Sequence, residues 1–173
     1  MTHKQVRALS ITALTLLLTS VAAAQKIRVE FDQGADFSKY KTFAIRGGQL
    51  NSKDAAFNSE LTRKRVESDI ERGLTVRGLT KAEGRADLNV RYHFGTARKT
   101  EVERYPAGWR GWGTRAVRVP YAEGTLVIDL RDSASRSLVW RGIATQKKDS
   151  ASDIAGKLDD MVRKSLEKYP PKK

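Results

Sequence analysis

Residues 121–144 hold the pattern that most constrains the fold of this chain. Two runs of alternating apolar and polar residues flank a break at residues 131–137 that contains Asp and several Ser residues. The larger apolar members of the two runs are Leu126, Ile128, Leu130, Leu138 and Trp140. Alternation with period two is typical of β-strands with one buried face, and the polar break is typical of a turn. We therefore predict a β-hairpin. Because Val127 and Ile143 make its second face partly apolar, we expect this hairpin in the middle of a sheet.

The first 24 residues predict a secretory signal peptide. Lys4 and Arg7 precede an uncharged stretch at residues 8–21, and three alanines then offer a cleavage site before Gln25. A membrane anchor is the alternative, but the apolar stretch is short and interrupted by Thr and Ser, whereas a spanning helix needs about 20 apolar residues. We therefore expect an exported protein, in the periplasm or peripherally associated with the outer membrane, with no membrane span in the mature chain.

The mature chain is expected to be strongly basic. The sequence has 33 Lys and Arg residues and 20 Asp and Glu residues, and residues 1–24 hold two of the basic residues and none of the acidic ones, which leaves a net charge of +11. In a cytosolic protein this charge would suggest a nucleic-acid partner. In an exported protein we expect no nucleic acid, and the same electrostatic force would attract anionic lipid, lipopolysaccharide or a cell-wall polymer. The alternative is a charge that only keeps the protein soluble.

Residues 25–173 are predicted to form a single two-layer α+β domain. Alternation indicates strands at residues 26–31, 40–45, 88–94, 117–130 and 138–143, and apolar residues at helical spacing indicate helices at residues 54–72 and 152–168. Gly47 and Gly48 are expected to end the second strand. Because consecutive strands are joined by short connections, we predict a mainly antiparallel or mixed sheet of about five strands with two helices packed on one face.

Few residues are available for catalysis. The chain has no Cys, and its two histidines are His3, in the predicted signal peptide, and His93, on the polar side of a predicted strand. The mature chain therefore does not have the residues needed for a histidine-based triad, a two-histidine metal site or a cysteine nucleophile. We predict no catalytic residue, no metal site and no cofactor, and interpret His93 as a partly exposed strand residue. An enzyme that uses acidic residues alone is the least favoured alternative.

The strongest candidate contact site is a loop predicted at residues 105–113. Aromatic and guanidinium side chains are interleaved in and just after this segment, at Tyr105, Trp109, Arg110, Trp112, Arg115 and Arg118. Tryptophan is favoured at membrane interfaces, and arginine binds phosphate groups through two parallel hydrogen bonds. We therefore interpret these residues as a loop that contacts an anionic partner. The alternative is that the tryptophans fold back and cover the open face of the sheet.

Asp129 interrupts the partly apolar second face of the predicted hairpin. A buried carboxylate is costly unless it is paired. Arg141 lies on the opposite strand and is the natural partner. We predict a structural ion pair between the two side chains.

The segments identified so far resemble a bacterial envelope family described as a domain of unknown function, DUF4136. The matching segments are DFSKYKTF at residues 36–43, ADLNV at 86–90, YAEGTLVIDL at 121–130, LVWRG at 138–142 and YP at 169–170. The resemblance implies an exported, commonly lipid-anchored, lipoprotein-like protein with no assigned activity, cofactor or catalytic residue. Because the chain has no Cys, it departs from the lipid-anchored members, and a soluble periplasmic form is expected.

Together these observations favour a non-enzymatic binding or envelope-maintenance protein that contacts anionic envelope components through a basic Trp and Arg loop. The alternative from another functional class is an accessory structural subunit that docks onto an envelope protein complex, in which case the positive charge is incidental.

Overall fold

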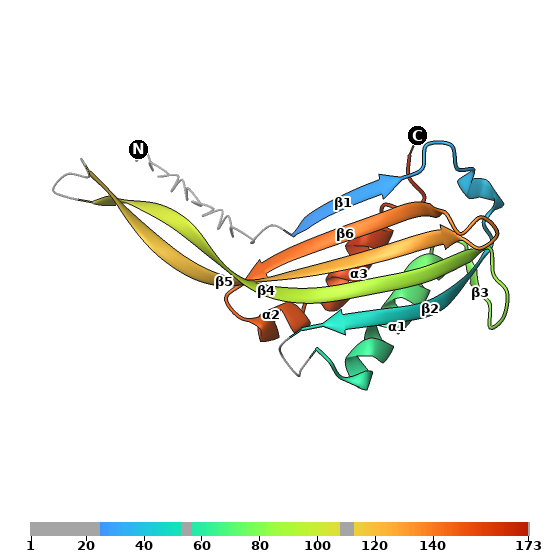
Figure 1. The fold of residues 1–173 in the computed structure, drawn as a ribbon, viewed down its shortest axis with the longest axis horizontal. Helices are drawn as coiled ribbons and strands as arrows, with labels where there is room; N and C mark the ends of the chain where they lie inside the picture. The colour runs from blue at the N-terminus through green and yellow to red at the C-terminus, as the bar shows by residue number, and fades with distance from the viewer. Residues whose placement is uncertain (1–24, 53–56, 108–112, 173) are drawn as a thin grey trace, which may run out of the picture.

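The computed structural model describes residues 25–52, 57–107 and 113–172. Six strands form one mixed sheet in the order β1-β6-β5-β4-β2-β3, and the sheet curls into a half-barrel. The strands are β1 (Lys26–Phe31), β2 (Thr42–Asn51), β3 (Thr80–Lys81), β4 (Leu88–Ala107), β5 (Gly113–Asp132) and β6 (Leu138–Lys148). The helices are the 3-10 helix η1 (Phe37–Lys39), α1 (Glu60–Thr75), α2 (Ala151–Ala155) and α3 (Leu158–Leu166). Figure 1 shows α1 and α3 against one face of the sheet.

The α+β class and the mixed sheet are confirmed, but the predicted strand and helix counts need correction. The sheet has six strands and not about five, because the two-residue strand β3 pairs with β2 at one edge. The C-terminal helical segment is divided into α2 and α3, since Gly156 caps α2 and Lys157 precedes α3. Among residues 25–52, 57–107 and 113–172, none of the helices has the length and hydrophobicity of a membrane-spanning segment.

The hairpin of β5 and β6 lies in the middle of the sheet, as the alternation predicts. Its strands are antiparallel, with β4 on one side and β1 on the other. The register places Leu130 opposite Trp140, and both side chains are fully buried beneath the helices. The helices contribute an apolar stripe to the same core, which includes Val66 and Ile70 of α1 and Met161 of α3. Burial of these side chains supplies the main stabilisation of the two layers.

Strand β2 continues past the two glycines that were expected to end it. A β-bulge between Ile45 and Gly47 interrupts its parallel pairing with β4, and the pairing then resumes as far as Asn51. Gly47 has a φ of 147°, which glycine adopts without steric cost. The glycines thus bend the strand and do not end it. The strand predicted at residues 40–45 is present as part of β2, but the prediction that Gly47 and Gly48 end it was wrong.

Helix α1 begins at Glu60, later than the sequence predicts. The side chain of Ser59 caps its N-terminus by accepting a hydrogen bond from the backbone N–H of Thr62, at 3.1 Å. The earlier part of the predicted helix includes residues 53–56, which lie outside the described residues.

Strands β4 and β5 are each 20 residues long and pair along their whole length. β2 ends opposite Gly95 and β6 ends opposite Ala122, so the farther parts of β4 and β5 continue as a two-stranded ribbon. Figure 1 shows this ribbon, here called the arm, projecting from the body of the molecule. Residues 105–107 therefore extend β4, where a loop was predicted, and residues 108–112 lie outside the described residues.

Candidate functional site

The sheet face opposite the helices carries a row of charged side chains. The strand registers place Glu30 of β1, Arg141 of β6, Asp129 of β5 and Arg91 of β4 next to one another across four strands. Residues paired in this way have side chains on the same face of the sheet. The order along the row is negative, positive, negative, positive, so each charge has a neighbour of opposite sign.

Asp129 and Arg141 form the ion pair expected from the sequence. Nε of Arg141 donates to Oδ1 of Asp129 at 2.7 Å, and Nη2 donates to Oδ2 at 2.8 Å. The Asp129 side chain is 7% exposed and that of Arg141 33% exposed. The hydrogen bonds that Arg141 donates to Asp129 raise the pKa of Arg141 above its ordinary value, and the charge of Glu30 acts in the same direction. Asp129 is therefore neutralised within the sheet face.

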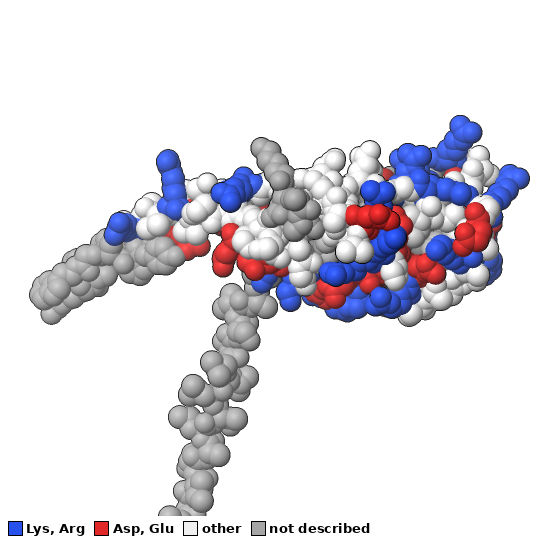
Figure 2. All heavy atoms as spheres, turned by 90° about the horizontal axis from the view of Figure 1, so that it is seen from below, with Lys and Arg blue, Asp and Glu red and all other residues white. Residues whose placement is uncertain are grey.

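Beside this pair lies a hollow of about 790 Å³, here called the arginine hollow. It is lined by five arginines, Arg46, Arg85, Arg91, Arg131 and Arg136, together with Ala86, Asn89, His93, Asp129 and Ser133. Asp129 is the only carboxylate among these lining residues, and Arg141 already neutralises it. The arginine hollow is therefore strongly positive. Figure 2 shows basic side chains projecting from the end of the body opposite the arm, where the β5–β6 turn lies.

Two of the five arginines are held in place by hydrogen bonds within the protein. Nε of Arg46 donates to Oδ1 of Asn89 at 3.0 Å, and its Nη2 donates to the carbonyl of Gly84. Nη1 of Arg131 donates to the carbonyl of Arg136 at 3.2 Å. Within the described residues, no hydrogen bond or ion pair is found for the guanidinium groups of Arg85, Arg91 and Arg136. These three groups remain available to a ligand.

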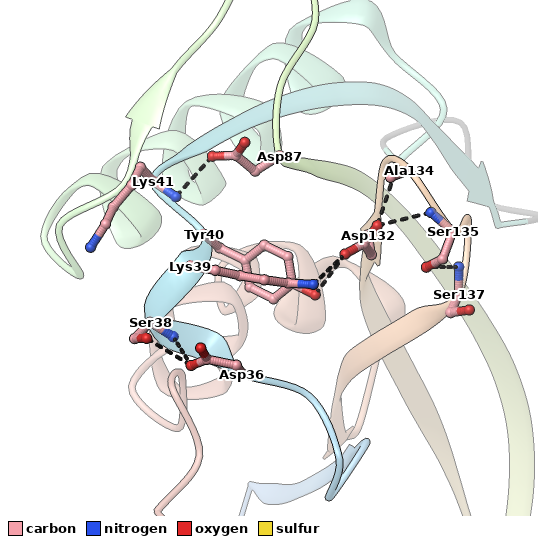
Figure 3. A network of polar contacts seen from close by, with 10 residues as sticks. All are labelled: Asp36, Ser38, Lys39, Tyr40, Lys41, Asp87, Asp132, Ala134, Ser135 and Ser137. Carbon is pink, nitrogen blue, oxygen red and sulfur yellow. Dashed lines mark hydrogen bonds and ion pairs between the residues drawn. The ribbon is translucent and has the colours of Figure 1, made fainter.

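Asp132 organises the β5–β6 turn, which carries Arg136. Its Oδ1 accepts hydrogen bonds from the backbone N–H groups of Ala134 and Ser135, each at 2.9 Å, and its Oδ2 accepts from the hydroxyl of Tyr40 and from Nζ of Lys39, each at 3.0 Å (Figure 3). These contacts, with the backbone of Ser135 first, hold the pKa of Asp132 well below its usual range. The turn is thus tied to the start of β2 by an ionised carboxylate.

Asp87 fixes the loop before β4, which carries Arg85. Its Oδ2 accepts from the backbone N–H groups of Lys41 and Thr42 and from the Thr42 hydroxyl, all at 2.9 Å; Figure 3 shows the Lys41 contact. The Lys41 backbone is the main cause of the lowered pKa of Asp87. The backbone N–H of Ser133 also donates to the Asp87 carbonyl at 2.9 Å. The loops that carry Arg85 and Arg136 are therefore joined to one another.

The segments that carry the family resemblance meet at this same end of the sheet. Tyr169 packs edge-on against Phe37 and Trp140, with ring centroids 5.8 Å away in both cases. Burial raises the pKa of the Tyr169 hydroxyl to about 12. The segments at residues 36–43, 138–142 and 169–170 are therefore in contact with one another.

The predicted contact residues of the arm are placed only in part. Trp109, Arg110 and Trp112 lie outside the described residues, and Tyr105 is described only by its backbone, which pairs with Arg115. Arg115 and Arg118 are exposed on β5. The structure therefore does not bring the six residues together into one described site, and the contact loop stays a prediction.

One face of the arm is purely basic in its charge. The register from Arg98 paired with Ala122 to Arg104 paired with Ala116 places Arg98, Arg104 and Arg118 on the same face. Thr100, Val102, Ala116, Pro120 and Ala122 complete it, and no acidic residue occurs among them. Val102 is 48% exposed. Figure 2 shows basic side chains on the projecting arm.

The other face of the arm has charges of both signs that are mutually paired. Lys99 contacts Glu123, and Nζ of Lys147 lies 3.0 Å from Oε2 of Glu101. Lys147 also lies over the ring of Tyr121, 4.7 Å from its centroid. The two faces of the arm therefore differ: one carries basic residues without acidic ones, and the other carries charges of both signs, among which Glu123 and Glu101 are paired with lysines.

Sequence reasoning missed the arginine hollow. Arg91 lies on the polar face of a strand that the sequence does predict, whereas Arg131 falls in the predicted turn and belongs to β5 in the structure. His93 is an exposed strand residue that lines the hollow. Arg46, Arg85 and Arg136 come from three separate connections or bulges. Only the pairing of β2 with β4 and of β4 with β5 brings them together, and no spacing in the sequence signals that pairing.

Comparisons with known proteins identify the family. The family model described as "Domain of unknown function (DUF4136)" matches residues 27–171. None of the curated proteins matches the sequence.

Two solved structures are similar to this chain, and the first of them supports the fold alone. A PDZ domain protein from Parabacteroides distasonis is 16% identical with a TM-score of 0.59, and the match covers 86% of this chain and 37% of that one. This chain therefore spans little more than a third of that protein. The PelC dodecamer from Paraburkholderia phytofirmans is 14% identical with a TM-score of 0.48, and the match covers 83% of this chain and 95% of that one. With the family model matched over almost the whole described chain, the protein belongs to the DUF4136 family.

Proposed function

We propose that this protein is a non-enzymatic binding protein of the bacterial cell envelope that attaches to an anionic surface through its arm. The observation that carries the proposal is the basic face of the arm, where Arg98, Arg104 and Arg118 lie together without an acidic neighbour on that face. Membership of a family without assigned activity and the shortage of catalytic side chains in the sequence are consistent with a binding role.

The chemistry of this face suits the surface of an anionic lipid layer. Guanidinium groups form paired hydrogen bonds with phosphate oxygens, and each basic residue near an anionic membrane contributes about 1 kcal/mol of attraction. Val102 adds an exposed apolar side chain among the arginines. The sequence also places Trp109 and Trp112 between the two strands of the arm, and tryptophan is favoured at the boundary between lipid and water.

Flotation with lipid vesicles tests this proposal. The chain without residues 1–24 is expected to float with vesicles that contain phosphatidylglycerol and to remain in solution with vesicles of phosphatidylcholine alone. The variant Arg98→Gln/Arg104→Gln/Arg118→Gln should lose about 100-fold in affinity, since three contributions of about 1 kcal/mol are removed. Salt at about 0.5 M should weaken wild-type binding because it screens the charges.

A matched control removes the same charge elsewhere. Arg63, Lys64 and Arg65 are exposed on α1, and the variant Arg63→Gln/Lys64→Gln/Arg65→Gln lowers the net charge by the same amount. It should retain most of the binding. Equal loss in both variants would show that only total charge matters, and equal flotation with both lipid compositions would reject the proposal.

A second candidate function is an accessory structural subunit of an envelope protein complex. It is favoured by the two-stranded arm, whose outer edges extend beyond the ends of β2 and β6. Unpaired strand edges can add a strand from a partner protein. Co-purification of one partner in a fixed ratio, lost when the arm is shortened, would support this candidate.

A further inference from the structure

We infer that the arginine hollow is a binding site for a phosphorylated sugar, either free or as the headgroup of a glycolipid. The site lies on the body of the molecule and goes beyond the proposed attachment through the arm. The inference rests on the five arginines that converge on one hollow, on the neutralisation of its single carboxylate by Arg141, and on the polar groups between them.

The charge of the hollow favours a dianionic group. Arg85, Arg91 and Arg136 have no partner for their guanidinium groups within the described residues, while Arg46 and Arg131 already donate to protein oxygens. In the row of charges, Arg141 lies between Glu30 and Asp129. Arg91 is at the end of the row, beside Asp129, and the lining of the hollow contains no other carboxylate. A phosphate group can accept two or more charge-assisted hydrogen bonds from such groups.

The size and composition of the hollow favour a sugar attached to that phosphate. At about 790 Å³ it is within the usual range for small-molecule sites of about 300–1,000 Å³ and much larger than a phosphate ion requires. Ala86 is the only aliphatic residue in its lining, and Asn89, His93 and Ser133 offer hydrogen bonds to hydroxyl groups. The hydroxyl oxygen of Ser133 is buried and has no partner within the described part of the chain. A ligand hydroxyl could supply the missing hydrogen bond.

The conformation of Arg136 supports a ligand-binding role for the turn. Its φ is 62°, the left-handed region that glycine or asparagine occupies at lower cost. The Asp132 carboxylate accepts hydrogen bonds from two backbone N–H groups of this turn, and the Arg136 carbonyl accepts a hydrogen bond from Arg131. An arginine in an unfavourable backbone conformation, at the rim of a positive hollow, is typical of a residue positioned for function.

Binding of glucose 1-phosphate, measured by isothermal titration calorimetry, tests the inference. Wild-type protein without residues 1–24 should bind with a dissociation constant of about 1 mM or tighter, and glucose should give no saturable binding. The variant Arg85→Gln/Arg91→Gln should bind about tenfold or more weakly, because two free guanidinium donors are lost. Arg63→Gln/Arg65→Gln, which removes the same charge from α1, should bind as wild type does.

Two further comparisons complete the test. The variant Arg98→Gln/Arg104→Gln/Arg118→Gln should keep wild-type affinity for glucose 1-phosphate, so failure of the arm proposal and failure of this inference are separable. In that same variant, tighter binding to phosphatidylcholine vesicles containing lipid A than to glucose 1-phosphate assigns a glycolipid source, whereas equal affinity assigns a free sugar phosphate. Absence of saturable binding to both probes, or equal weakening by the α1 variant, would overturn the inference.

Discussion

Arg141 and Asp129 face each other across the central hairpin and are joined by two parallel hydrogen bonds of 2.7 and 2.8 Å. This geometry fixes the planes of both side chains and gives the nearly buried Asp129 carboxylate a cationic partner. It also separates the roles of the basic residues on the open face, because Arg141 is committed to Asp129 while Arg91 is not.

Arg141→Ala should lower the free energy of unfolding by about 2–3 kcal/mol, since it leaves the Asp129 carboxylate buried without its partner. The double variant Asp129→Leu/Arg141→Leu should be closer to wild type than Arg141→Ala is, because no charge then remains buried. Urea unfolding followed by circular dichroism measures both. If the effects of Asp129→Leu and Arg141→Leu simply add in the double variant, the two side chains do not interact in solution.

Asp132→Asn should destabilise the protein at neutral pH by about 1–3 kcal/mol, because it weakens the contacts to Lys39, Tyr40 and the turn. The pKa of Asp132 is lower in the folded state than in the unfolded chain. Its contribution to stability is therefore complete above the ordinary carboxyl pKa of about 4 and decreases as the pH falls below that value. The difference in the free energy of unfolding between Asp132→Asn and wild type should therefore become smaller as the pH falls below about 4.

Urea unfolding at a series of pH values provides that comparison. Glu60→Gln, which alters an exposed carboxylate on α1, is the matched control and should change stability little at any pH. If the difference in the free energy of unfolding between Asp132→Asn and wild type grew on acidification, the lowered pKa of Asp132 in the folded state would be contradicted.

Gly48→Ala should lower the free energy of unfolding by about 2–3 kcal/mol, because a Cβ there would lie 1.9 Å from Cζ of Tyr92. The ring would have to move, and its hydroxyl would lose the 3.0 Å hydrogen bond to Glu67. Gly84→Ala, where a Cβ meets no atom within 4 Å, is the control and should stay within about 0.5 kcal/mol of wild type. Thermal unfolding distinguishes the two, and similar values would refute the close packing of β2 on Tyr92.

Arg136→Gly should raise the free energy of unfolding by about 0.5–1 kcal/mol, since glycine adopts the left-handed conformation more readily. The same change should weaken binding of glucose 1-phosphate, because one guanidinium group leaves the arginine hollow. Chemical unfolding and calorimetry on one preparation give both values. A variant that is more stable and binds equally well would remove Arg136 from the proposed site.

The parts of the fold that bury one face could be predicted from the sequence. The alternation around Leu126 and Ile128 identified the central hairpin, and the spacing of Val66 and Ile70 identified the first long helix, because burial imposes a period on apolar residues. The arm could not be predicted in this way. Its β5 strand was predicted only from residue 117 onward, where Val117, Val119 and Tyr121 alternate with polar residues or small ones. Its β4 strand from residue 96 onward is polar and charged, because no described helix covers this part of the sheet, and the Gly and Pro residues near the end of the arm suggested a loop.

The candidate sites could likewise be predicted only where burial leaves a pattern in the sequence. The ion pair of Asp129 and Arg141 could be predicted because a charged residue interrupted an apolar pattern within one hairpin. The arginine hollow depends on parallel pairing between β2 and β4 across residues 52–87, and on turns whose conformation is set by Asp87 and Asp132. Such long-range pairing leaves no periodic signal in the sequence, so Arg46, Arg85 and Arg136 could not be recognised as neighbours.

In this account the protein has two separate sites for anionic partners, one on the arm and one on the body. Heteronuclear NMR of the chain without residues 1–24 tests it most directly, since each backbone amide reports its own surroundings. Glucose 1-phosphate should shift the amide signals of residues 89–93 and 131–136 and leave those of residues 98–104 unchanged, while phosphatidylglycerol nanodiscs should broaden the signals of residues 98–104 and 116–120 first. Shifts that spread evenly over all basic residues with both partners would contradict the claim and indicate a positive charge without a dedicated site.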